Sequence, residues 1–88
     1  MRVQATKTMA KAIQQYCKTD ERFHGYQITT EDITDYFVGT NTYIKVIYPY
    51  DYYALPNYLS TRDLTKIYNR SDKTYDGFMK AVLEEIEV

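Results

Sequence analysis

Apolar side chains recur at every third or fourth position near the start of the chain, which is the spacing of one helical face. The positions are Met9, Ala12, Ile13, Tyr16 and Cys17. This pattern predicts an amphipathic helix over about residues 4–18. Lys18 falls in its last turn, where a cation suits the negative end of the helix dipole, and Gly25 marks a turn beyond it.

From residue 26 the apolar spacing shortens to about two, which is typical of strands. Residues 26–30, 33–38 and 42–48 contain many β-branched and aromatic side chains, and these favour extended backbone. Gly39-Thr40-Asn41 supplies a turn between the last two segments, because glycine and asparagine tolerate positive φ. The sequence therefore predicts a β-hairpin over residues 33–48, with or without 26–30 as a third strand.

Residues 30–37 allow a second interpretation. Thr30 before Glu31-Asp32 resembles the start of a helix, where a hydroxyl caps and carboxylates follow. The segment is then either a strand or a short helix, and the alternation of its side chains favours the strand.

After residue 48 the chain is expected to form an ordered aromatic loop over residues 49–59 and then a short helix. The loop begins at Pro49, which has no N–H to donate to a strand neighbour. Ser60 and Asp63 have the spacing of a capping box, and an apolar stripe follows over residues 64–68.

A last helix is expected to start at a Ser71 cap. Its apolar positions follow the 3.6-residue period closely: Tyr75, Phe78, Met79, Val82, Leu83 and Ile86. Gly77 lies inside this helix, where glycine costs about 1 kcal/mol relative to alanine. We therefore expect close packing or a bend at Gly77.

With 88 residues, of which 44% are apolar and 26% charged, the chain is long enough for one globular domain, residues 1–88. The fold class predicted is α+β: an N-terminal helix, an antiparallel β-hairpin or three-stranded sheet, then two C-terminal helices. The helices are expected to cover one face of the sheet and to leave the other partly open.

Cys17 is the single cysteine, which excludes an intrachain disulfide and suits a reducing compartment. No apolar run follows Met1, and no window approaches the 18 apolar residues of a membrane span. We therefore expect a cytoplasmic protein without a membrane partner.

No residue pattern points to catalysis. His24 is the only histidine and has no partners at ligand spacing, the three glycines are scattered, and no carboxylate pair stands out from the surface acids. We predict no enzyme activity, no catalytic residue, no cofactor, no metal site and no small-molecule substrate.

The tyrosines are the most unusual part of the composition, because six of the eleven lie in residues 43–58. Four of the eleven fit core or sheet positions: Tyr36, Tyr43, Tyr48 and Tyr68. A second group crowds a turn and is hard to bury together: Tyr50, Asp51, Tyr52, Tyr53 and Tyr58. Exposed tyrosine gives a rigid contact area with a polar tip, so this group is either a protein-binding surface or plain packing.

Acidic residues gather in the middle of the chain, at Glu31, Asp32 and Asp35, with Asp51 after the hairpin. A row of carboxylates would speed association with basic partners and select for them. A solvated hairpin face is the alternative.

Residues 60–79 resemble a helix-turn-helix. Leu64, Tyr68, Tyr75 and Phe78 occupy the apolar packing positions of that family, and Asn69 stands at the turn. The resemblance implies that Arg62, Lys66, Arg70, Lys73 and Thr74 contact duplex DNA, with Lys73 and Thr74 nearest the bases. The alternative is an ordinary capped helix pair, since Asp72 and Asp76 lie beside Lys73.

In size, tyrosine content and acidity the whole chain is similar to small inhibitors encoded by phages and mobile elements, including anti-CRISPR proteins. That similarity implies a non-enzymatic binding protein that blocks a larger host protein or nucleoprotein complex stoichiometrically. Two functions are therefore expected: inhibition of a larger host protein, such as a CRISPR nuclease, or, as the alternative, transcriptional regulation through the helix-turn-helix.

Overall fold

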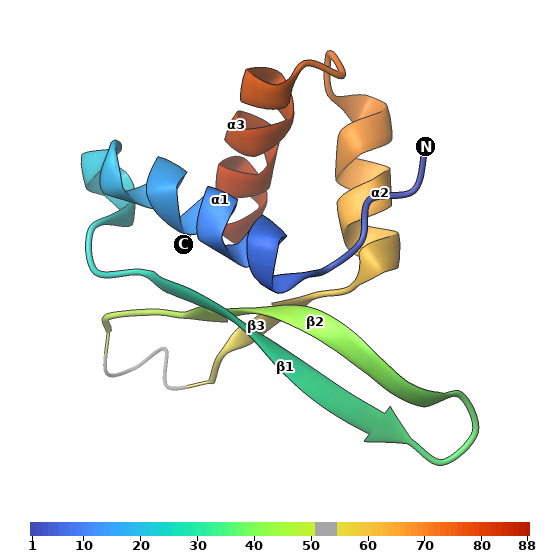
Figure 1. The fold of residues 1–88 in the computed structure, drawn as a ribbon. Coiled ribbons are helices and arrows are strands. Elements are labelled where there is room, and N and C mark those ends of the chain that lie inside the picture. Colours follow the sequence, from blue (N-terminus) through green and yellow to red (C-terminus); the bar gives the residue numbers. More distant parts are fainter. Residues whose placement is uncertain (51–54) are drawn as a thin grey trace.

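The computed structural model describes residues 1–50 and 55–88, and its α+β fold confirms the class expected from the sequence (Figure 1). A helix comes first, a sheet follows, and two helices end the chain. The elements are α1 (Lys7–Lys18), the 3-10 turn η1 (Glu21–Phe23), β1 (Gln27–Asp35), β2 (Gly39–Ile47), β3 (Asn57–Leu59), α2 (Thr61–Arg70) and α3 (Tyr75–Ile86).

The three strands form one antiparallel sheet in the order β1-β2-β3. β1 and β2 pair along their whole length, from Gln27 opposite Ile47 to Asp35 opposite Gly39. β3 is much shorter and pairs only with residues 44–46 of β2. The outer half of the β1–β2 hairpin therefore projects beyond β3 and beyond the helices (Figure 1).

The hairpin differs from the expected one in its turn. The segments expected as separate strands at 26–30 and 33–38 join into the single strand β1, so a helix over residues 30–37 is wrong. The turn is residues 36–38, because the Asp35 carboxylate accepts from the backbone N–H groups of Phe37 (2.8 Å) and Val38 (3.2 Å) and Gly39 takes a positive φ. Thr40 and Asn41, expected in the turn, instead pair with β1.

The third strand also differs from expectation, because β3 lies within the stretch 49–59 that was expected to be a loop. Leu59 at its end is buried and faces the same side as Ile44, its partner in β2. A short strand with one core residue leaves little periodic signal in the sequence.

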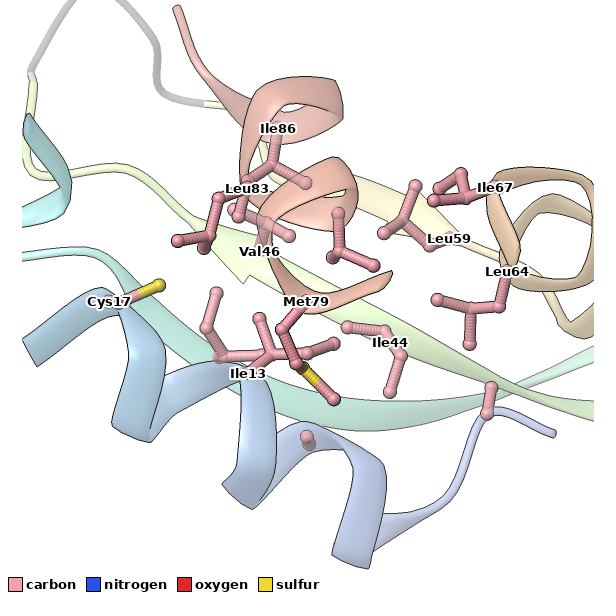
Figure 2. Packing of buried hydrophobic residues seen from close by; sticks show 14 of the residues in the cluster. Ile13, Cys17, Ile44, Val46, Leu59, Leu64, Ile67, Met79, Leu83 and Ile86 are labelled. Carbon is pink, nitrogen blue, oxygen red and sulfur yellow. The ribbon is translucent and has the colours of Figure 1, made fainter. Parts of the chain in front are cut away.

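The helices cover one face of the sheet, and the core lies between the two layers (Figure 1). Figure 2 shows Ile13 of α1 and Met79 of α3 lying close to Ile44 of β2. Leu64 and Ile67 extend this cluster from α2, beside Leu59 (Figure 2). No charged or polar residue is buried in the part of the chain that the structure describes.

Residues 1–6 are extended, so α1 begins later than the residue 4 expected, after the Thr6 cap. Two threonines one turn apart on α2 hold this segment: Thr65 Oγ1 accepts from the N–H of Val3 (2.9 Å), and Thr61 Oγ1 accepts from that of Ala5 (3.1 Å). Val3 and Ala5 are buried. The N-terminus is therefore fixed alongside α2 (Figure 1).

One helix cap is confirmed and one is wrong. Ser60 and Asp63 form the complete capping box expected at the start of α2. Ser71 closes the end of α2 and does not start α3, because its hydroxyl donates to the Tyr68 carbonyl (2.7 Å). Thr74 caps α3 instead, accepting from the N–H of Gly77 (3.0 Å).

The close packing expected at Gly77 is confirmed, because a Cβ there would overlap the carboxylate of Asp72. That carboxylate accepts from both the N–H (2.9 Å) and the hydroxyl (2.7 Å) of Thr74. A side chain at Gly77 would force Asp72 away from these bonds.

Substituting Gly77→Ala should leave the free energy of unfolding unchanged or lower it, although alanine is favoured in helices by about 1 kcal/mol. In an Asp72→Ala background, which lacks the overlapping carboxylate, Gly77→Ala should raise the free energy of unfolding by about 1 kcal/mol. Urea unfolding of the single and double variants measures both effects. An equal gain in both backgrounds would contradict this explanation.

Candidate interaction surfaces

The tip of the hairpin carries three consecutive exposed apolar residues. Tyr36 is 94% exposed, Phe37 89% and Val38 72%. The Asp35 carboxylate and the positive φ of Gly39 fix this turn on either side, and the Tyr36 and Phe37 rings meet edge to face at 5.1 Å. The tip is thus an ordered apolar projection.

Sequence reasoning missed this surface, because it extended the strand pattern through Val38 and assigned Tyr36 to the sheet. The signal that could have located it was the pair Asp35 and Gly39. Aspartate favours turns that its carboxylate can cap, and glycine supplies positive φ at their end.

The sheet face without helices carries a charged and aromatic cluster. Lys45 of β2 is paired with Tyr58 of β3, whereas Glu31 of β1 is paired with Tyr43 and reaches Lys45 diagonally across the sheet. The Lys45 ammonium is 2.9 Å from one Glu31 oxygen, and the Tyr58 hydroxyl donates to the other at 3.0 Å. Tyr43 meets the Tyr58 ring edge to face at 6.3 Å. Glu31 is thus partnered on both oxygens.

These bonds shift the pKa values of all three groups. The bond from Lys45, and then that from Tyr58, lowers the pKa of Glu31 below its ordinary value of 4.5. The bond to Glu31 raises the pKa of Lys45 and that of Tyr58. Because the pKa of Glu31 is lower in the folded state, its contribution to stability is present above about pH 4.5 and is lost as the pH falls through the folded value.

The three hairpin carboxylates expected as a row are not gathered into one. Asp32 lies on the opposite face of β1 from Glu31, since adjacent residues alternate in a strand, and it accepts from the Thr42 hydroxyl at 2.7 Å. Asp35 holds the turn. Each carboxylate therefore has a structural partner, although Asp32 and Asp35 remain exposed near the tip.

The tyrosine group expected after the hairpin is described only in part. Tyr50 is 40% exposed, and Tyr58 is half-buried in β3. Asp51, Tyr52 and Tyr53 lie outside the described residues.

Two of the five residues expected to contact DNA lie in a basic cleft. Arg62 and Lys66 line it from α2, and Arg2, which sequence reasoning missed, lines it from the N-terminal segment. The cleft has a volume of about 610 Å³ and is bounded on its other side by residues 40–43 of β2. Among the described residues that line it there is no aspartate or glutamate.

The other three residues expected to contact DNA lie elsewhere and have local roles. Arg70 is 3.3 Å from a Glu85 carboxylate oxygen of α3. The Lys73 ammonium donates to the Asn69 carbonyl at 3.2 Å, and Thr74 caps α3. The structure therefore does not bring the five residues together on one surface.

The single thiol of the protein belongs to the core. Cys17 is buried, and burial raises the pKa of its thiol to about 11, so it stays protonated at neutral pH and packs as a small apolar side chain. Within residues 1–50 and 55–88, no group of three histidine, cysteine or acidic side chains is placed to hold a metal ion. In the same ranges, no helix has the length and apolarity needed to cross a bilayer.

No protein-family model, curated protein or solved structure matches the chain.

The pKa of Tyr58 should fall towards that of ordinary tyrosine in Glu31→Gln, because the neutral amide no longer opposes ionisation of the hydroxyl. NMR titration of ring-labelled tyrosine measures this change. Tyr16 is the internal control, since its carboxylate neighbour is Asp76, and its pKa should not move. An unchanged Tyr58 pKa would show that the Glu31 carboxylate is not its partner in solution.

Proposed function

We propose that this protein is a non-enzymatic binding protein that associates stoichiometrically with a larger protein, with the hairpin tip as the principal contact. The observation that carries the proposal is the exposure of Tyr36, Phe37 and Val38 together on an ordered turn. Isolated exposed apolar residues are common on soluble proteins, whereas contiguous projecting ones mark interaction sites. Because the turn is already ordered, binding costs little further conformational entropy.

The charge around the tip indicates the chemistry of the partner. From residue 31 to residue 44 the chain has three carboxylates and no lysine or arginine. Two of the carboxylates, Asp32 and Asp35, are exposed beside the tip. The partner surface that fits is an apolar pocket with a basic rim, since complementary charge speeds association and excludes acidic competitors.

A basic rim around a pocket is also typical of proteins that hold nucleic acid. Together with the similarity of the chain to small phage and mobile-element inhibitors in size, tyrosine content and acidity, this favours inhibition of a host nucleic-acid-binding protein. CRISPR nuclease complexes are the first candidates to test.

Replacing the two tip aromatics, Tyr36→Ser with Phe37→Ser, should weaken binding of the partner at least about thirtyfold, which is the effect of losing a binding hot spot. Folding should be unchanged, because both side chains are exposed. The partner is first identified by affinity capture from host lysate and mass spectrometry. Its affinity and stoichiometry are then measured by calorimetry.

Tyr75→Ser is the matched control, since Tyr75 is also an exposed aromatic, at 63%, but lies on α3. It should bind the partner as the unsubstituted protein does. Equal binding by the tip variant, with its fold intact, would refute the role of the tip.

DNA-binding regulation is the second candidate, and it is favoured by the exposed Arg62 and Lys66 on one side of α2. Against it, α2 and α3 run side by side in opposite directions (Figure 1), whereas the helices of a helix-turn-helix cross at about 90–120°. Arg70 and Thr74 also have local partners. The protein-binding proposal is therefore better supported.

The two candidates make opposite predictions for duplex DNA. The protein-binding proposal predicts no detectable change in the fluorescence anisotropy of labelled duplex DNA at low salt. Regulation through residues 60–79 predicts binding that weakens steeply with salt and that is lost in Arg62→Ala with Arg70→Ala. The latter result would favour the regulator.

A further inference from the structure

Part of the central strand has a free edge. Within the described residues, β2 has strand neighbours on both sides only at residues 44–46, where β3 pairs with it. α2 begins two residues after Leu59 and turns the chain away from the sheet (Figure 1). Along residues 39–43, the backbone groups on the side of β3 have no backbone partner among the described residues.

This free edge is one wall of the basic cleft. The opposite wall is the N-terminal segment and the first turns of α2, which are tied together by the bonds of Val3 to Thr65 and of Ala5 to Thr61. The cleft, about 610 Å³, lies within the range of about 300–1,000 Å³ that is usual for ligand sites. An extended segment of about five residues matches the length of the edge.

The charge of the cleft is strongly one-sided. Arg2, Arg62 and Lys66 are all exposed, and none of them forms an ion pair with a carboxylate in the portion of the chain that is described. The chain as a whole carries a net charge of −1, whereas the described charged side chains that line the cleft are all positive. Complementary charge therefore favours an acidic ligand in this cleft.

The free edge decides which acidic ligand fits. A strand edge presents both N–H donors and C=O acceptors, and a phosphate backbone offers only acceptors to them. An extended peptide offers both groups in the alternation that the edge needs. We propose that the cleft binds an extended acidic peptide segment of a partner protein, which adds a strand to β2 along residues 39–43.

The other free edge of the sheet does not offer this site. Among the described residues the outer edge of β1 has no strand neighbour, but its outer part carries Glu31, Asp32 and Asp35, which repel an acidic strand. Charged side chains on an edge are a common protection against unwanted pairing. The outer half of the hairpin thus has one edge that is acidic over residues 31–35 and one edge in a basic cleft.

The cleft and the hairpin tip are different surfaces, so the inference goes beyond the proposed function. A short peptide that adds to residues 39–43 does not need Phe37. Replacement of the tip aromatics should therefore leave peptide binding unchanged. A negative result for peptide binding in the cleft would not contradict partner binding through the tip, and the reverse also holds.

The test uses a fluorescein-labelled peptide of alternating glutamate and valine, which places its carboxylates on one face of a strand. Fluorescence anisotropy should show saturable binding, and Arg62→Glu with Lys66→Glu should weaken it at least about tenfold. Amide hydrogen exchange over residues 39–43 should slow when the peptide is bound, which a purely electrostatic contact would not cause.

Three controls separate strand addition from other binding. Lys7→Glu with Lys11→Glu makes the same charge change beside β1, where both lysines line a smaller cavity, and it should leave the affinity unchanged. The same peptide N-methylated at alternate backbone nitrogens keeps its charge but loses donors, and it should not bind. An oligothymidylate should bind more weakly than the peptide.

The proposal would be overturned if the peptide did not bind, or if Lys7→Glu with Lys11→Glu lowered the affinity for the peptide as much as Arg62→Glu with Lys66→Glu does. Retained binding of the N-methylated peptide, or tighter binding of the oligothymidylate, would also overturn it. Sedimentation of the protein alone tests whether a second copy fills the cleft with its acidic β1 edge. Self-association that is abolished by Arg62→Glu with Lys66→Glu would assign the cleft to that copy instead.

Discussion

Ile44 and Val46 of the central strand have no exposed surface, and they mark the extent of the hydrophobic core along the hairpin. Burial of such side chains beneath the helices is the main favourable contribution to folding. From Ile44 towards the tip, the helix-facing positions of β2 are Thr42 and Thr40. These side chains are polar, so burial beneath a helix would not stabilise them as it does Ile44. The core therefore ends halfway along the hairpin.

The outer half of the hairpin is stabilised by other interactions. Side-chain bonds cross the two strands, from the Thr42 hydroxyl to Asp32 (2.7 Å) and between the hydroxyls of Thr34 and Thr40 (2.8 Å). Such cross-strand pairs contribute roughly 0.2–1 kcal/mol each, which supports a projecting hairpin without a second layer. Because this half is uncovered, both the tip and the free edge of β2 are accessible to a partner.

The sequence predicted the helices well and the hairpin less well, for a physical reason. Of the six apolar residues expected on one face of α3, the five from Phe78 to Ile86 are buried and only Tyr75 is exposed, because the buried face repeats along most of the helix. In β1, only Ile28 is fully buried, so the alternation fades and the end of the strand must be inferred from turn chemistry. Gly39 was expected to begin the turn, whereas its positive φ closes the turn.

The binding surfaces were predictable only in part, because they depend on contacts between distant segments. Arg62 and Lys66 were singled out, but Arg2 joins them only because Thr61 and Thr65 hold the N-terminus beside α2. Composition cannot show that Glu31 is partnered by Lys45 and Tyr58, since strand register decides it.

The two proposed contacts are adjacent along the chain, and this bears on how a whole partner would bind. Gly39 begins β2 immediately after Val38 of the tip. A segment added along residues 39–43 would therefore have one end next to the apolar tip. A partner that supplies both an acidic strand and an apolar pocket would then bind the two surfaces at once. The second contact would form within the complex at high effective concentration, which strengthens binding without any change in either surface.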